Sequence, residues 1–340
     1  MNEKSFWYIV CNSSELKPNH VLSRCVLDEW LVIFRDENGE AKIFRDLCVH
    51  RNSQLSRGRV RDGKLQCGYH GWTFNGNGEV VWIPSEGSDC KSRFTNRCLK
   101  VYEVKEKDDY VYVRLDNEIS EMIPFKMPCY KEEGYSSIRL INRFFNNVTN
   151  CAENFVDVPH TVFVHPLIFR NLKKQKFKAQ IKRENGSVIV EYQNETSNFG
   201  IFSWFLNSSG SEIQHRDEFH MPNITSVHYH FGGKKHFIIT SQSVPVSSDE
   251  TLVYTDLTYN YGLWNRFAQP IIRWQGQKII DQDIEILGNQ MKMIKKYGQK
   301  FMNSPADYIH VFIESIRESI QKESDPRSLS PKSMEVDFWV

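Results

Sequence analysis

The sequence lacks several features that would place the protein in a specialised class. It has no long apolar run, and the first apolar stretch, residues 6–11, is far shorter than a membrane span or the core of a signal peptide. Neither sign of charge dominates, because 43 Lys and Arg residues face 42 Asp and Glu residues. This balance gives no indication of nucleic acid or an anionic membrane as a partner. We therefore expect no membrane span and no nucleic-acid partner.

Cysteine is also scarce for a disulfide-stabilised protein. The eight cysteines are scattered over 340 residues, whereas disulfide frameworks belong to short secreted domains. A reducing, cytoplasmic location is expected. A chain of this length is long enough for two domains with their own cores. Aromatic residues make up 13% of the chain, which indicates well-filled cores and, more weakly, an apolar pocket.

The first part of the chain has the pattern of an all-β domain. Short strand-like pieces fill residues 6–116, and Gly, Asn, Asp and Pro residues separate them in turn-like clusters. Residues 117–135 contain two prolines, several acids and little periodicity. We therefore place the domain boundary near residue 118, which predicts domains 1–118 and 119–340.

The second part mixes helices and strands. A helical stretch is predicted around 145–158, and the strand-like runs between residues 188 and 259 fit one antiparallel sheet. A long helical pattern over 263–297 contains Pro270, which is expected to interrupt it. A last helix is predicted after residue 304, where a Ser-Pro pair suits a helix start. The fold class is therefore α+β, with an antiparallel sheet flanked by helices after an all-β domain.

Two short segments of the first domain carry metal-binding residue types. Cys48-Val-His50 and Cys67-Gly-Tyr-His70 each supply one thiolate and one imidazole. Zinc fingers usually pair two cysteines in one segment and two histidines in the other. In a Rieske [2Fe–2S] cluster one iron takes both cysteines and the other takes both histidines. The pattern therefore favours this cluster, with zinc, or a coincidence of Cys/His pairs, as the alternatives.

The flanking residues resemble those of the Rieske family. Gly71 and Trp72 follow the last candidate ligand as they do in that family, where the glycine leaves room for the cluster and the tryptophan shields it. Val49, Asn52 and Gly68 depart from the usual family residues. None of these departures removes a ligand, but they bear on the hydrogen bonds that set the cluster potential.

The second domain has its own candidate metal site. His160 and His165 lie five residues apart, and Asp157 precedes the first of them by three. Two histidines and one carboxylate form the facial triad of non-haem Fe(II) oxygenases, which leaves positions open for O₂. At this spacing Asp157 is better placed to bond the far nitrogen of an imidazole than to share its metal. The third ligand should therefore come from elsewhere.

Helical spacing selects among three acids for that third ligand. Asp283 has apolar residues at three and four positions on either side, so it lies in the middle of the buried stripe of its helix. Asp281 and Glu285 have mostly polar residues at the same spacings. An ionised acid on an apolar stripe is costly unless a metal or a cation pairs with it. We predict Asp283 as the ligand and keep Asp281 as the alternative.

Over nearly its whole length the chain resembles the oxygenase component of Rieske non-haem iron oxygenases. The family stretch N-x-x-D-x-x-H-x-x-x-x-H matches Asn154, Asp157, His160 and His165, and a family helix motif resembles the sequence that begins at Asp283. The resemblance implies that the two histidines and the late aspartate bind mononuclear Fe(II). It also implies that Asp157 bridges to a cluster histidine of a neighbouring subunit, and that Asn154 is a polar neighbour of the iron.

This resemblance predicts the terminal oxygenase of a multicomponent system, of the compact homotrimeric monooxygenase-like type. Such an enzyme hydroxylates or oxidatively demethylates a small, largely apolar organic substrate with O₂. No flavin or nicotinamide fingerprint occurs in the sequence, so a separate reductase and/or ferredoxin should supply the electrons. Ring dihydroxylation is the alternative within the class. A Rieske electron-transfer or redox-sensing protein without oxygenase activity is the alternative from another class.

Two other groups of residues are expected to have structural rather than functional roles. Five histidines lie between residues 215 and 236, and their strand-like context predicts sheet packing or pocket lining rather than a metal site. Phe163 and Trp264 could line a substrate pocket, but packing in a core is the default expectation for both.

Overall fold

A computed structural model describes most of the chain. The described residues are 1–87, 97–116, 122–166, 176–193, 213–233 and 235–339. The chain divides into two compact units, one of Lys4–Lys126 and one of Met1–Glu3 with Met127–Val340. The predicted boundary at residue 118 falls in 117–121, outside the described residues.

The Lys4–Lys126 unit consists of three small antiparallel sheets, as the all-β prediction requires. The first has the order β1-β10-β9, the second β2-β3-β4 and the third β5-β6-β7-β8. The strand bounds are β1 Trp7–Asn12, β2 Leu22–Val26, β3 Glu29–Arg35, β4 Ala41–Arg45, β5 Arg59–Arg61, β6 Lys64–Gln66, β7 Thr73–Phe74, β8 Val80–Trp82, β9 Glu103–Lys107 and β10 Tyr110–Arg114.

Buried apolar side chains of the strands form the core of this unit. Phe34 on β3 and Phe44 on β4 are fully buried, with their rings 5.2 Å apart in an edge-to-face arrangement. The same buried cluster contains Phe74 and the two cysteines of the predicted cluster site, Cys48 and Cys67. The core therefore anchors the base of both cysteine-containing loops.

The second unit is built on one eight-stranded antiparallel sheet of order β11-β17-β16-β15-β14-β13-β12-β18. The sequence predicted four of these strands, and the α+β class is confirmed. The bounds are β11 Ser136–Phe144, β12 Lys176–Glu184, β13 Ser187–Gln193, β14 Gln214–His220, β15 Ile224–His230, β16 His236–Ser247, β17 Glu250–Asn260 and β18 Lys332–Trp339.

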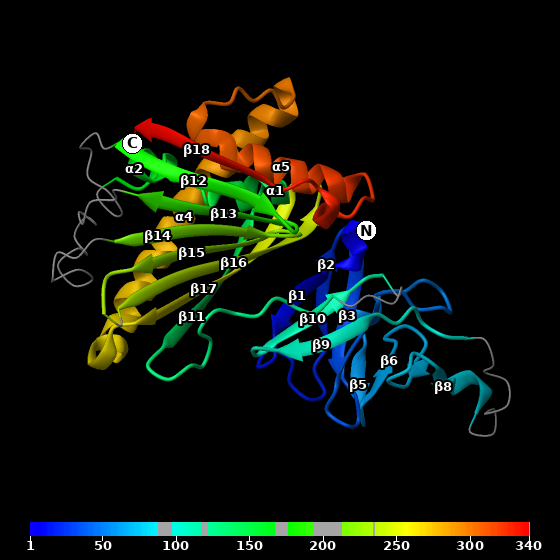
Figure 1. Ribbon diagram of the computed structural model, residues 1–340. Coiled ribbons are helices and arrows are strands. Elements are labelled where there is room, and N and C mark those ends of the chain that lie inside the picture. The colour runs from blue at the N-terminus through cyan, green and yellow to red at the C-terminus, as the bar shows by residue number, and fades with distance from the viewer. Residues whose placement is uncertain (88–96, 117–121, 167–175, 194–212, 234, 340) are drawn as a thin grey trace. The chain divides into compact units, whose positions relative to one another are not determined.

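Four α-helices in the described residues accompany this sheet. They are α1 Val148–Asn154, α2 His160–Val164, α4 Asn265–Tyr297 and α5 Tyr308–Gln321. Figure 1 shows α4, in gold, running along one face of the sheet. Ile280 and Leu287 of α4 belong to one buried cluster with Leu140 of β11 and Leu257 of β17. A Cβ on Gly276 would lie 2.6 Å from a methyl of Leu257, so glycine permits this close approach.

The expected interruption of the long helix is wrong. The helix α4 is continuous through Pro270, which lies in its second turn. Only one backbone hydrogen bond is lost at this position, and packing on the sheet compensates for it. The last helix predicted after residue 304 is confirmed as α5, which buries Ile309, Phe312, Ile313, Ile316 and Ile320 on one face. Among the described residues, none of the helices has the length and apolar character needed to cross a bilayer.

Candidate metal centres

The two Cys/His loops of the first unit fold in the same way. In each loop the cysteine amide donates to the carbonyl five residues further on, at 2.8 Å for both Cys48 and Cys67. The residue four positions after the cysteine donates back to the cysteine carbonyl and has a positive φ, 55° at Asn52 and 72° at Gly71. Both loops therefore present their side chains in an equivalent arrangement.

This geometry brings the four predicted ligands together. Cys48 and Cys67 are buried in the same apolar cluster. The rings of His50 and His70 lie 4.6 Å apart, with His50 half-buried and His70 exposed. Trp72 stacks on His50 at 4.6 Å and is itself buried. The site therefore suits a group held by thiolates on its inner side and by imidazoles on its outer side.

The spacing of these four residues argues against a single zinc ion. In the described part of the chain, only His160, His165 and Asp283 bring three potential ligand atoms within 4.8 Å of one another. A lone tetrahedral ion needs such convergence, whereas a two-iron cluster is wider. The four Cys/His residues thus fit a cluster better than zinc.

Two of the departures from the family pattern have structural explanations. Asn52 adopts the left-handed conformation, and Asn is one of the few residues other than Gly that tolerates it. A Cβ on Gly68 would lie 2.8 Å from the carbonyl oxygen of Arg57, so this glycine allows two backbones to meet. Both departures therefore preserve the loop fold.

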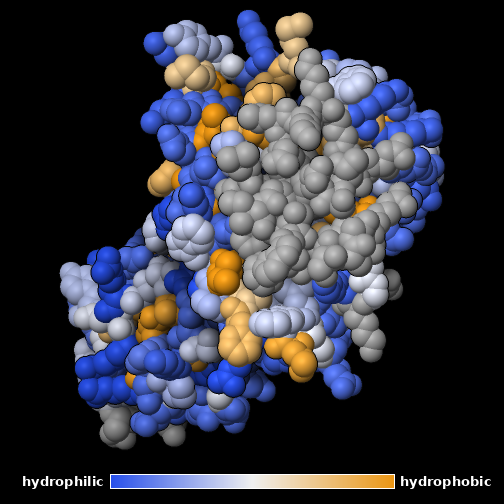
Figure 2. All heavy atoms as spheres, turned by 90° about the vertical axis from the view of Figure 1, so that its left-hand side faces the viewer, coloured by the Kyte–Doolittle hydropathy of each residue, from blue (hydrophilic) through white to orange (hydrophobic). Residues whose placement is uncertain are grey.

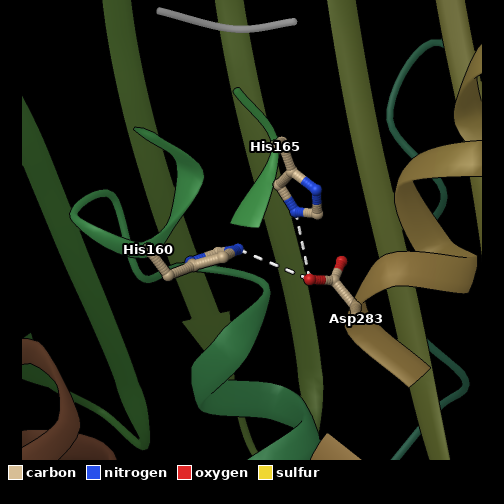
Figure 3. A group of neighbouring side chains, drawn as sticks. All are labelled: His160, His165 and Asp283. Carbon is tan, nitrogen blue, oxygen red and sulfur yellow. Dashed lines mark ion pairs between the residues drawn. The ribbon is translucent and has the colours of Figure 1, made fainter. Parts of the chain in front are cut away.

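The second centre is assembled from two helices of the other unit. The helix α2 begins at His160 and ends just before His165, while Asp283 lies in the middle of α4. One oxygen of Asp283, Oδ1, lies 3.0 Å from Nε2 of His165 and 3.6 Å from Nε2 of His160. Figure 3 shows both imidazoles directed at this oxygen. His165 and Asp283 are buried and His160 is largely so.

The far nitrogens of the two imidazoles have their own partners. Nδ1 of His165 donates to Oε1 of Gln282 at 2.9 Å, and Nδ1 of His160 lies 3.4 Å from Oδ2 of Asp157. Gln282 thus orients the ring of His165, and the Nε2 atoms of both imidazoles turn toward Oδ1 of Asp283. That buried oxygen makes no aligned hydrogen bond with any described residue. Two imidazole nitrogens that converge on one carboxylate oxygen fit a bound metal ion, and this combination of ligands fits iron.

The charge of the surroundings also favours a cation. Burial lowers the pKa of His160, but the carboxylates of Asp157 and Asp283 outweigh this effect and raise the pKa to about 9. Burial raises the pKa of Asp283, but its contacts with His160 and His165 outweigh that effect and leave it below the usual value. Asp283 is therefore ionised, and the site has an excess of negative charge for a metal to balance.

The other predicted site residues lie close by in the chain. Asp157 faces Nδ1 of His160, on the side away from Asp283, as its spacing predicted. Asn154 ends α1, and its buried Oδ1 makes no hydrogen bond among the described residues. Asp281, the alternative ligand, is exposed and accepts a hydrogen bond from Gln277 at 2.8 Å. Asp281 is not part of the convergent group.

Sequence reasoning missed Gln282 as a partner of His165. Gln282 directly precedes Asp283, so its side chain leaves α4 about 100° away around the helix axis. Spacing alone therefore gave no reason to assign it to the same site. A polar residue next to a predicted buried ligand is the one signal that could have identified it.

Two protein-family models match this chain. Residues 6–103 match the family model of the Rieske [2Fe–2S] domain, and residues 147–318 match that of the vanillate O-demethylase oxygenase C-terminal domain. The second match covers half of the chain. An iron–sulfur domain joined to a two-histidine, one-carboxylate centre defines the class of Rieske non-haem iron oxygenases. The chain belongs to this family, in the group with the vanillate O-demethylase oxygenase C-terminal domain, whose cofactors are a [2Fe–2S] cluster and mononuclear iron.

Individual relatives are distant. Protein TIC 55, chloroplastic, from Arabidopsis thaliana is 26% identical over 85% of this chain and 54% of its own length. The vanillate O-demethylase oxygenase subunit of Pseudomonas sp. (strain HR199 / DSM 7063) is 35% identical over 33% of this chain and 30% of its own length. The chain spans about half the length of the first curated relatives it matches.

Solved structures share the fold over nearly the whole chain. Dicamba monooxygenase bound to dicamba superimposes with a TM-score of 0.81 at 18% identity, covering 94% of this chain and 98% of its own. NdmA from Pseudomonas putida CBB5 gives a TM-score of 0.75 at 20% identity, covering 97% of this chain and 96% of its own.

Proposed function

We propose that the protein is the terminal oxygenase of a multicomponent Rieske system, and that it hydroxylates or oxidatively demethylates a small, largely apolar organic molecule. The observation that carries this proposal is the convergence of His160, His165 and Asp283 in the same chain as a Rieske domain. An electron carrier would need only the first unit. A buried site with metal ligands supplies the place for oxygen chemistry.

Each centre has its own set of residues in this proposal. Cys48, His50, Cys67 and His70 hold the [2Fe–2S] cluster. The set of His160, His165 and Asp283 holds Fe(II), which when bound supplies the activation of O₂. The chain's own contribution is to fix the two imidazoles through Asp157 and Gln282 and to keep the three ligands largely out of water.

Asp157 is proposed to connect the two kinds of centre across subunits. Its carboxylate faces the outer nitrogen of His160, and the family resemblance extends this contact to a cluster histidine in a neighbouring subunit of a homotrimer. The cluster end of the first unit suits such a contact, because His70 is exposed and is flanked by the exposed apolar residues Val49 and Tyr69. Asn154, with its unpaired buried oxygen, is proposed as the polar neighbour of the iron.

The reaction consumes two electrons and two protons for each O₂. One oxygen atom enters the substrate as a hydroxyl group and the other leaves as water. When the hydroxyl forms on an O-methyl or N-methyl group, the product loses formaldehyde. Monooxygenation is favoured over ring dihydroxylation because relatives in the family include a vanillate O-demethylase subunit and a methylxanthine N1-demethylase.

The electrons are proposed to come from a separate reductase and/or ferredoxin. The sequence carries no fingerprint for flavin or nicotinamide binding, so this chain needs an external donor. The predicted cytoplasmic location belongs to the same proposal, and cell fractionation with an antibody against the chain tests it.

Iron analysis combined with product analysis tests the proposal. The purified protein should contain about three irons per chain, two in the cluster and one at the second centre. With a reductant and ¹⁸O₂, a panel of aromatic, methylated and terpenoid compounds should yield a product with one labelled oxygen. Two labelled oxygens in a diol would establish the dihydroxylase alternative.

The same measurements separate the other classes. Two irons per chain, with no product and no H₂O₂ from reduced protein, would establish a Rieske electron-transfer or redox-sensing protein. Zinc in place of iron, with no visible absorbance, would establish a zinc-stabilised module.

A further inference from the structure

Large apolar side chains are exposed on the short 3₁₀ helix Gly262–Trp264, which follows β17, and on the first turns of α4 directly after it. The exposed fractions are 96% for Leu263, 65% for Trp264, 69% for Phe267, 49% for Ile271 and 64% for Trp274. We call these five residues the aromatic face. The expectation that Trp264 packs in a core is therefore wrong, and so is the same expectation for Phe163, which is 79% exposed. Nothing in the local sequence pattern distinguished the two faces of this helix segment.

The aromatic face points away from the sheet. At 100° per residue, Phe267, Ile271 and Trp274 lie roughly opposite Gly276 and Ile280, which pack on β11 and β17. This part of the helix is thus apolar on both sides. Beyond Trp274 the outward positions become charged. A helix segment that is apolar all round is normally covered on both sides. We therefore infer that the outward side contacts a partner when the protein functions.

Most of the charged residues on the helix segment that carries the aromatic face are positive. Residues 257–280 contain no Asp or Glu but include Arg266, Arg273 and Lys278, all exposed. The ammonium group of Lys278 lies 5.5 Å from the ring centre of Trp274. The preceding acid, Asp256, is fully buried and is paired with Arg139. The apolar residues are therefore bordered mainly by positive charge on this helix segment, and the next exposed acids are Asp281 further along α4 and Glu132 and Glu133 before β11.

This charge disfavours a two-fold contact between copies of the chain, because such a contact through the aromatic face would bring the same three cations against one another. Figure 2 looks onto the side of the molecule where the first turns of α4 lie in Figure 1, and it shows orange, hydrophobic side chains gathered there among polar ones. An anionic partner with an apolar interior satisfies both properties of this face.

We propose that the aromatic face docks on the surface of an anionic lipid bilayer. Trp and Phe side chains favour the boundary between headgroups and acyl chains, and Arg and Lys beside them pair with lipid phosphates. The segment lies in the plane of the surface and does not cross it, in agreement with the absence of a spanning helix among the described residues. This goes beyond the proposed oxygenase function, and it gives an enzyme for apolar molecules access to substrate dissolved in lipid.

Vesicle binding of the iron-loaded, full-length protein tests the proposal. We expect co-sedimentation with phosphatidylglycerol/phosphatidylcholine vesicles, at least tenfold weaker binding to pure phosphatidylcholine, and loss of binding in high salt. Tryptophan fluorescence should shift to the blue on binding. The triple variant Leu263→Ser/Phe267→Ser/Trp274→Ser should bind vesicles at least tenfold more weakly.

A matched variant controls for general changes in surface hydrophobicity. Phe301→Ser/Met302→Ser removes two exposed apolar residues that lie beyond the C-terminal end of α4, and it should leave vesicle binding unchanged. Iron content and turnover of a water-soluble substrate should be equal in all three proteins, so failure of lipid binding is distinguishable from failure of the oxygenase proposal.

Three results would overturn the lipid proposal. One is a wild-type protein that ignores anionic vesicles. Another is a triple variant that binds them as well as the wild type. The third is a triple variant that changes the oligomeric mass in size-exclusion chromatography, which would make the aromatic face a contact between copies of the chain.

Discussion

The two metal centres differ in how their ligands are distributed along the chain and in how much water reaches them. The proposed cluster ligands all lie within Cys48–His70, on two loops with matching hydrogen bonds. The proposed iron ligands are His160 on α2, His165 just after it and Asp283 on α4, which is far away in sequence. The cluster histidines are accessible, whereas His165 and Asp283 are buried.

This difference corresponds to two tasks. A centre that exchanges electrons with another protein needs an accessible edge, and a local motif on a rigid β core provides one. A centre that activates O₂ near a substrate needs protection from water, and this requires ligands from several packed elements. Each centre should therefore fail separately when its own ligands are changed.

The largest expected effect comes from Asp283→Asn. This change removes the carboxylate on which both imidazoles converge, so the iron content should fall from about three to about two per chain and product formation should be lost. The visible spectrum of the cluster should remain. Metal analysis and absorbance spectroscopy measure this, with the exposed Asp281→Asn as the control that keeps three irons. Loss of iron in the control instead would make Asp281 the ligand.

The reciprocal change is Cys67→Ser, which removes a thiolate from the buried side of the cluster. The visible absorbance should disappear and iron should fall to about one per chain, while Fe(II) still binds at the second centre. Electron paramagnetic resonance of the nitric oxide adduct reports that remaining iron. If both kinds of iron were lost together, the two centres would not be independent.

A smaller effect is expected for Asp157→Asn, which keeps all the proposed ligands but weakens the connection between the centres. Iron should remain at about three per chain. Reoxidation of the reduced cluster in single-turnover experiments with substrate and O₂ should slow by about 10–100-fold, the usual cost of changing a partner of a metal ligand. Unchanged reoxidation would remove Asp157 from the proposed path.

Gln282→Leu should weaken iron binding without abolishing it. The variant leaves Nδ1 of His165 without its acceptor, so the tautomer that turns Nε2 toward the metal is less favoured. The apparent Kd for Fe(II) should rise by about 10–100-fold. Gln282→Glu keeps an acceptor at the same place and should bind Fe(II) at least as well as the wild type. Equal affinities in the Leu variant and the wild type would contradict the orienting role.

The last prediction concerns stability and involves Glu153, a buried acid on α1 in the unit that carries the second metal centre. Burial, and to a lesser extent Glu314, Asp157 and Asp307, raise the pKa of Glu153 on α1 to about 9. The folded chain keeps this proton while the unfolded chain, with an ordinary pKa of 4.5, releases it. The protonated Glu153 side chain therefore costs the folded state nothing below about pH 4.5. As the pH rises from 4.5 toward 9, the unfolded chain releases this proton and the folded chain does not, so the free energy of unfolding falls.

Glu153→Gln removes this loss. At pH 8 the variant should have a Tm on the order of 10 °C above that of the wild type. The reason is that pH 8 lies more than three units above the unfolded pKa of 4.5, each unit corresponds to about 1.4 kcal/mol, and 1 kcal/mol shifts Tm by roughly 2–4 °C. At pH 5 the difference should nearly vanish. Thermal unfolding at both pH values measures it, and the exposed Glu318→Gln on α5 should show no such pH dependence. If the Tm difference between the variant and the wild type were smaller at pH 8 than at pH 5, the ionisation of Glu153 would not be what destabilises the wild type.

Much of the first centre was predictable because its information is local. The Cys-x-His and Cys-x-x-His spacings, and the turn residues around them, already define two similar loops. The left-handed conformation of Asn52 is also compatible with its residue type. For the second centre, helical phase was sufficient to prefer Asp283 over Asp281, since the buried stripe of α4 passes through Asp283.

Other features could not be predicted from pattern alone. Strands β11, β12, β14 and β18 were missed because their alternation includes many polar and charged residues. Pro270 was expected to interrupt α4, but packing on the sheet holds the helix through it. The partnership between Gln282 and His165 depends on how two helices meet, which local spacing does not contain.

The residues alone were enough to predict two metal centres, their ligand types and the α+β class, because spacing and periodicity follow from short-range geometry. Tertiary packing decided which donors converge. It oriented His160 and His165 through Asp157 and Gln282, and it left the outward side of α4 exposed. These outcomes depend on contacts between elements distant in the chain, whose energies are set by burial and by the pairing of charge.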